Sequence, residues 1–243
     1  MRALLGGLAI LFLTACAVQA DRPLSAEESQ RAARANTDLA IYHLQELDLA
    51  RAKDRALRAL QQDPQYVTAH LVTAEIQVEL DNPEAAEQHF REALRLEPDN
   101  GAALNNYAGF LCRQGRVMQA VDLYELAIAN PLYAQRNVAR VNAGRCLADV
   151  DQPAQAARYW QAALEHDPAS APALRGMSEI FLARGDTDRA RVFYSRYTAE
   201  SVETPSMLWL GVRIATAEGD RAGAEELKSR LRQRYPEFEI PHN

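Results

Sequence analysis

The chain has 243 residues and a formal net charge of −6, with 48% hydrophobic and 25% charged residues. This composition excludes a disordered chain and a polytopic membrane protein, and the chain is long enough to bury an extended core. Its pI is near 5.5, and its lysines and arginines are scattered. We therefore exclude nucleic acid as a partner.

Residues 1–15 predict a lipoprotein signal peptide. Arg2 precedes an uncharged apolar run over residues 3–13, which is too short to span a bilayer. The segment Leu13-Thr14-Ala15-Cys16 resembles the bacterial lipobox, whose cysteine is diacylated before cleavage on its N-terminal side. The alternative is an ordinary secretory signal cleaved near Ala20. In either case residues 1–15 are not part of the fold.

The residues that follow the signal predict an anchored leash. A lipid-modified Cys16 would carry several acyl chains, and two or more chains are what firm membrane anchoring requires. The next residue is Ala17 and not the Asp that retains a lipoprotein in the inner membrane, which indicates the outer membrane, on the periplasmic side. Residues 16–30 are polar, contain Pro23 and lack an apolar period, so we expect a flexible leash.

The rest of the chain is an internal repeat. Small residues recur with spacings of 34, 34, 36, 34 and 34, at Ala52, Ala86, Ala120, Ala156, Ala190 and Ala224. A second series has the same spacings, at Ala40, Ala74, Ala108, Gly144, Ser178 and Val212. A period of 34 residues is that of the tetratricopeptide repeat, a helix-turn-helix unit. The sequence therefore predicts an all-α fold, a right-handed α-solenoid of six such repeats.

The residue types fit two antiparallel helices, A and B, in each repeat. Small residues allow helix A to cross helix B closely, while one position of helix B carries the bulk that fills the space between repeats, at Phe90, Tyr124, Trp160 and Tyr194. Proline ends helix B because it cannot continue a helix, at Pro64, Pro98, Pro168 and Pro236.

These signals place the solenoid at residues 31–238, followed by a tail at 239–243. The repeats run approximately over 33–66, 67–100, 101–136, 137–170, 171–204 and 205–238. The two extra residues of the third repeat must lie between Ala127 and Gly144, most simply in the loop from Asn130 to Asn137.

The sequence offers no catalytic, metal or cofactor site. The histidines show no His-Glu-x-x-His spacing. We expect each histidine to stand alone, either exposed to solvent or packed in the fold. No Gly-x-Ser-x-Gly motif and no glycine-rich phosphate loop is present. We predict a protein that is not an enzyme and that takes no small-molecule substrate.

Two cysteines remain once Cys16 is assigned to lipid. Cys112 and Cys146 fall on helix A of the third and fourth repeats, and neighbouring A helices pack side by side in this architecture. Because the periplasm is oxidising, we predict a disulfide between them. The alternative is a pair of small buried thiols.

The concave side of such a solenoid is formed by its A helices, and the residues on this side predict a groove for a partner protein. The groove-facing positions of repeats three to five carry Asn105, Asn106, Arg113, Asn142, Arg145, Arg175 and Glu179. Uncharged amides and guanidiniums beside apolar residues suit an extended or helical peptide, because the amides can pair with its backbone. Ordinary polar surface is the alternative for any single residue. We do not predict the Lys-and-Asn clamp for a C-terminal carboxylate, because the position of Asn105 is Val141 in the next repeat.

The lipobox, the leash, the six repeats and a cysteine-bearing centre together resemble the type IV pilus biogenesis lipoproteins of the PilW/PilF family. The discriminating segments are residues 104–112, Leu-Asn-Asn-Tyr-Ala-Gly-Phe-Leu-Cys, and residues 142–146, Asn-Ala-Gly-Arg-Cys. The resemblance implies a pilotin, which assists the outer-membrane localisation and multimerisation of the secretin pore. An outer-membrane repeat lipoprotein that recruits peptidoglycan hydrolases, or assembles another envelope complex, is the alternative.

Overall fold

The computed structural model describes residues 25–239, which form twelve helices and no strand. The first of the two helices in each pair spans α1 Ala26–Gln45, α3 Val67–Glu79, α5 Gly101–Arg113, α7 Arg136–Ala148, α9 Ala171–Ala183 and α11 Pro205–Ala217. The second spans α2 Leu49–Gln62, α4 Pro83–Leu96, α6 Val117–Ala129, α8 Pro153–His166, α10 Thr187–Glu200 and α12 Arg221–Arg234. The all-α solenoid of six helix pairs is therefore confirmed.

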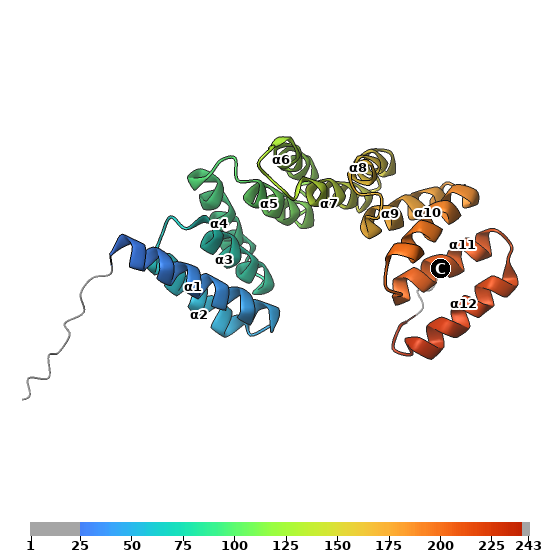
Figure 1. Ribbon diagram of the computed structural model, residues 1–243, viewed down its shortest axis with the longest axis horizontal. Coiled ribbons are helices and arrows are strands. Elements are labelled where there is room, and N and C mark those ends of the chain that lie inside the picture. The colour runs from blue at the N-terminus through green and yellow to red at the C-terminus, as the bar shows by residue number, and fades with distance from the viewer. Residues whose placement is uncertain (1–24, 240–243) are drawn as a thin grey trace, which may run out of the picture.

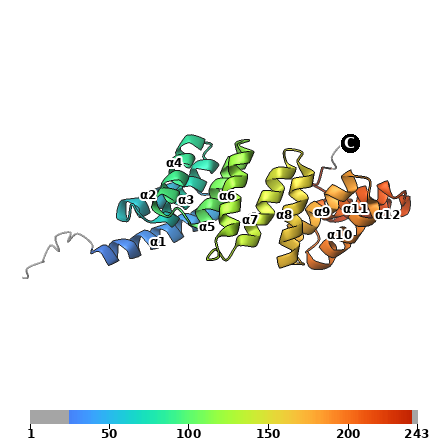
Figure 2. The same ribbon diagram turned by 90° about the horizontal axis from the view of Figure 1, so that it is seen from above.

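The helix pairs follow one another along a curved array (Figures 1 and 2). Each first helix contacts the first helix of the next pair, while consecutive second helices make no such contact. The array therefore bends toward the first helices, and in the centre of Figure 1 α6 and α8 lie on the outer rim of the arch. The first helices form the inner, concave face.

The turn inside each pair contains one residue with a left-handed backbone. These residues recur at the repeat spacing, at Leu47, Asp81, Gly115, Asp151, Gly185 and Gly219. Glycine adopts a positive φ without cost, and aspartate tolerates it better than most residues. Leu47, with φ 57° and a side chain 75% exposed, is the unfavourable member of the series.

The expected leash over residues 16–30 is too long at its C-terminal end. Helix α1 begins at Ala26, because Ser25 and Glu28 form a capping box: the Ser25 hydroxyl accepts from the Glu28 amide, and the Glu28 carboxylate accepts from the Ser25 amide. The capping motif starts the helix before the first apolar period, so residues 26–30 belong to the fold. The signal peptide and Cys16 lie outside the described residues.

The two extra residues of the third repeat lie in the connection between α6 and α7. This connection covers residues 130–135, whereas those before α5 and α9 cover only 97–100 and 167–170. The longer loop carries Tyr133, whose ring packs so closely on Gly101 that a Cβ there would lie 2.3 Å from it. The longer loop thus packs against the start of α5.

The core consists of alanines at the crossings and large side chains between pairs. Phe90, Tyr124 and Trp160 are buried on α4, α6 and α8. Trp160 lies between Gly144 of α7 and Gly176 of α9, where an added Cβ would come within 2.5 and 2.4 Å of the indole. Its Nε1 donates to the Val141 carbonyl at 3.2 Å. One indole therefore joins three helices.

His70 and His89 are paired rather than single. Their Nδ1 atoms lie 3.1 Å apart within the second helix pair, and His70 Nε2 lies 3.0 Å from the Pro64 carbonyl oxygen. Because a carbonyl only accepts, His70 Nε2 carries a proton and, in the neutral ring, its Nδ1 accepts from His89 Nδ1. Burial, followed by the charge of His70, lowers the pKa of His89, while Glu92 opposes the shift.

We expect this pair to destabilise the fold in mild acid. The lowered pKa means that the unfolded chain binds a proton below about 6.5 while folded His89 still resists it. Stability is therefore present above this pH and is lost as the pH falls through the folded pKa. Urea unfolding at several pH values from 7.5 to 5 should show the loss, and His89→Gln should reduce it. His166→Gln, at an exposed histidine, is the control, and an equal pH dependence in both variants would contradict the assignment.

Candidate partner-binding surface

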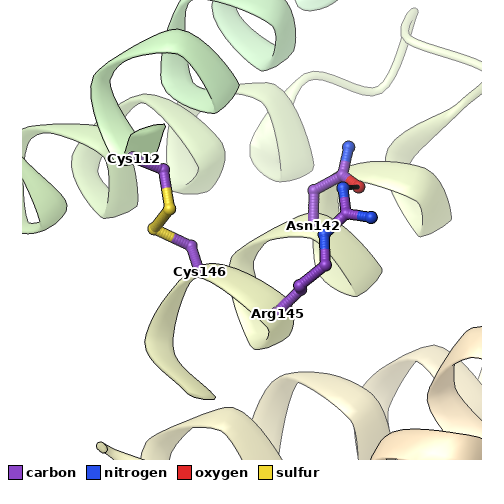
Figure 3. Close-up of a disulfide and its surroundings, with 4 residues drawn as sticks. All are labelled: Cys112, Asn142, Arg145 and Cys146. Atoms are coloured by element: carbon purple, nitrogen blue, oxygen red, sulfur yellow. Dashed lines mark hydrogen bonds between the residues drawn. A yellow bond between two sulfur atoms is a disulfide. The ribbon is translucent and has the colours of Figure 1, made fainter. Parts of the chain in front are cut away.

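The concave face of α5 and α7 carries a row of hydrogen-bonded side chains. Arg145 Nη2 donates to Asn142 Oδ1, Asn142 Nδ2 donates to Asn105 Oδ1, and Asn105 Nδ2 donates to Asn106 Oδ1, each at 3.1 Å. Figure 3 shows Arg145 and Asn142 side by side on α7. The row connects neighbouring repeats across the concave face.

The position of Asn105 differs from the sequence-based expectation. Its side chain is only 8% exposed, and both ends of its carboxamide bond other side chains. Asn105 therefore braces α5 against α7 and does not offer a free amide to a peptide backbone. Asn106 and Asn142 are half-buried, while Arg113 and Arg145 are exposed.

Cys112 and Cys146 form a disulfide beside this row (Figure 3). Their Cα atoms are 5.8 Å apart, within the usual range for a disulfide. The bond closes a sequence separation of 34 residues and joins α5 to α7 at a second point. The third and fourth repeats are thus linked both covalently and by the Asn105–Asn142 hydrogen bond.

Arg175 and Glu179 lie next along the concave face, on α9. They form an ion pair of 3.6 Å, with both side chains exposed by about two fifths. Together with Arg145, Val141 and Trp160 they line a cavity of about 290 Å³ between α7 and α9. The residues that line the cavity are thus partly apolar and partly charged.

At the other end of the face, Glu75 and Glu79 lie on α3. Burial raises the pKa of Glu75, the nearby Arg113 guanidinium opposes this shift, and Glu79 adds to it. The concave face is therefore acidic on α3 and carries guanidiniums on α5, α7 and α9.

Sequence reasoning missed Tyr124 and Gly109 as parts of this surface. Tyr124 was assigned only to the space between repeats, but its hydroxyl reaches Gly109 of α5, where an added Cβ would lie 3.5 Å from it. Burial raises the pKa of Tyr124 to about 12, against the opposing charges of Arg145 and Arg113. A glycine inside helix A, where it lowers the helix propensity, was the available signal.

The described residues contain no group of three or more His, Cys, Asp or Glu side chains able to hold a metal ion. None of the helices between residues 25 and 239 is long and apolar enough to cross a membrane. What this surface offers chemically is hydrogen bonding, charge and apolar contact to another chain.

Comparisons with known proteins agree with the fold. Two tetratricopeptide-repeat family models match, one at residues 37–90 and 73–135 and the other at residues 147–210. Together with the six helix pairs, they define the chain as a tetratricopeptide-repeat protein.

Individual relatives are more specific. The chain is 29% identical to the type IV pilus assembly protein PilF of Pseudomonas aeruginosa over 97% of this chain and 94% of that protein. The structure of P. aeruginosa PilF superposes with a TM-score of 0.76 at 27% identity, covering 86% of this chain and 95% of PilF. The crystal structure of PilW, described as a widely conserved type IV pilus biogenesis factor, has a TM-score of 0.78 at 30% identity, covering 86% and 96%. The chain belongs to the PilW/PilF family of tetratricopeptide-repeat proteins.

Proposed function

We propose that this protein is a pilotin of type IV pilus biogenesis: a non-enzymatic lipoprotein on the periplasmic side of the outer membrane. It assists the outer-membrane localisation and multimerisation of the secretin by binding it. The observation that carries the proposal is the similarity to PilF, a type IV pilus assembly protein, along nearly the whole chain. The concave face supports it, because polar groups, guanidiniums and a partly apolar cavity suit a protein segment.

The test compares secretin multimers in cells that lack this gene with those in cells that carry it. Heat- and detergent-resistant multimers in the outer membrane should be lost or strongly reduced without the gene, and a plasmid copy should restore them. Normal multimers in the deletion strain would reject the pilotin function. If cell-wall hydrolases were mislocalised in that strain instead, the protein would be a recruiting scaffold.

We predict that Cys16→Ser removes the membrane attachment without affecting the fold, because all twelve helices of the described residues lie between Ala26 and Arg234. Fractionation of cells that also lack the secretin should find the variant in the soluble periplasm and the wild type in the outer membrane. Recovery of the variant in the outer membrane of these cells would contradict lipidation at Cys16.

A further inference from the structure

Arg113 and Arg145 are the sequence neighbours of the two disulfide cysteines on the concave face. Arg113 directly follows Cys112 on α5, and Arg145 directly precedes Cys146 on α7. Consecutive Cα atoms are about 3.8 Å apart, so each arginine is one residue away from a covalently fixed point. The disulfide thereby limits how far the two arginine backbones can move apart.

The buried Tyr124 of α6 places a third donor near these arginines. The residue is 2% exposed, and its hydroxyl has no hydrogen-bond partner among residues 25–239. A Cβ at Gly109 would lie 3.5 Å from this hydroxyl and 3.9 Å from Arg113 Nη1. Apart from the backbone of α5 and the residues next to Gly109 in the chain, only these two groups lie within 4 Å of that point.

Neither arginine is in direct contact with a carboxylate among residues 25–239, although the charge of Arg113 acts on Glu75. Within the described part of the chain, no carboxylate lies within 4 Å of the guanidinium of Arg113 or Arg145, whereas Arg175 on the next first helix is paired with Glu179. Among residues 25–239, the only acceptor that Arg145 bonds is the neutral Asn142 carboxamide. A tyrosine hydroxyl is protonated at neutral pH, so that of Tyr124 can donate. Two guanidiniums without a direct ion pair therefore lie near enough to the Tyr124 hydroxyl for their charges to act on it.

We propose that Arg113, Arg145 and Tyr124 bind a side-chain carboxylate of an extended partner segment, and that the Cys112–Cys146 disulfide holds the two arginines at the spacing this requires. The inference rests on the proposed function, since it specifies the chemistry of the segment that the concave face takes. Charge complementarity favours a segment with charges of both signs: its carboxylate meets Arg113 and Arg145, and a basic residue beside it meets Glu75 and Glu79 on α3.

The direct test uses synthetic peptides on the full-length protein in detergent. The probes are hexaglutamate and hexaglutamine, each acetylated at its N-terminus and amidated at its C-terminus, and calorimetry measures binding. Hexaglutamate should bind, more weakly as salt is raised, and hexaglutamine should not. Arg113→Gln plus Arg145→Gln should weaken hexaglutamate binding by roughly 10- to 100-fold, since charged hydrogen bonds are the strong ones.

The matched control is Arg158→Gln, at an exposed arginine on α8 outside the concave face. Equal hexaglutamate affinity in the double variant and in Arg158→Gln would overturn the site. Hexaglutamine with a free C-terminus that binds as tightly as amidated hexaglutamate would also overturn it, in favour of a terminal carboxylate. Replacement of both cysteines by serine should weaken hexaglutamate binding at a temperature where this variant is folded, and undiminished binding would remove the disulfide from the proposal.

Secretin-binding measurements distinguish the carboxylate site from the proposed pilotin function. Detergent-solubilised secretin should bind immobilised wild-type protein and the Arg158→Gln variant, and bind the Arg113→Gln plus Arg145→Gln variant at least tenfold more weakly. Failure of the wild type to bind secretin, with hexaglutamate binding intact, would reject the pilotin function while the carboxylate site stands. Equal binding of secretin by all three proteins would reject the site while the function stands.

Discussion

Replacement of Cys112 and Cys146 by serine is expected to lower the free energy of unfolding by up to about 3.8 kcal/mol, the chain-entropy value for a loop of about 34 residues. The structure places the bond between α5 and α7, in the middle of the array. Because each repeat of a solenoid is stabilised mainly by its neighbours, the loss should be concentrated in the third and fourth repeats. Hydrogen exchange of the amides of α5 to α8, with urea unfolding of the whole chain, would measure it.

Reductant provides the internal control for this prediction. It should lower the unfolding temperature of the wild type to that of the double serine variant and leave the variant unchanged. Mass spectrometry of freshly isolated protein, alkylated before reduction, should find Cys112 joined to Cys146. Two alkylated thiols at these positions would show that the bond does not form in the cell.

The sequence predicted the repeats well because the requirements of helix crossing are local. A close crossing accepts only a small residue, so alanines at Ala86 and Ala120 mark the period without knowledge of the fold, and they are fully buried. The positive-φ turn positions obey the same period. The start of α1 at Ala26 could have been recognised from the Ser25–Glu28 capping box, but the apolar period alone does not reveal it.

The contacts between repeats could not be predicted in this way. The burial of Asn105 depends on Asn142, 37 residues later, and the pairing of His70 with His89 depends on the angle between α3 and α4. Neither of these two side-chain contacts follows from residue type. The same applies to Tyr133, whose position on Gly101 depends on the path of the longer loop between α6 and α7.

Trp160→Ala is expected to destabilise the protein by about 3–5 kcal/mol, the usual range for deleting a large buried aromatic side chain. The cavity should collapse poorly, because the two helices that face the indole present glycines there, Gly144 and Gly176. The hydrogen bond from Nε1 to the Val141 carbonyl is lost as well. Chemical unfolding of the variant against the wild type gives the free-energy difference.

Gly144→Ala should have opposite effects on stability in the wild type and in the Trp160→Ala variant. In the wild type, the new Cβ at position 144 would lie 2.5 Å from the Trp160 indole. The indole cannot move aside, because its other edge packs against Gly176 so closely that a Cβ there would lie only 2.4 Å away. Overpacking of this kind costs about 1–3 kcal/mol. In the Trp160→Ala background the methyl group fills part of the cavity, and alanine is favoured over glycine in a helix by about 1 kcal/mol, so the same substitution should stabilise.

Gly109→Ala is the control for helix propensity, because its Cβ would meet nothing closer than 3.5 Å. It should stabilise the protein slightly in both backgrounds. A cycle of the four proteins with Trp or Ala at 160 and Gly or Ala at 144 measures the coupling energy, expected at about 1–3 kcal/mol for residues in direct contact. If Gly144→Ala has the same effect in both backgrounds, the glycine is not required by Trp160, and the packing of the fourth repeat against the fifth must depend on other contacts.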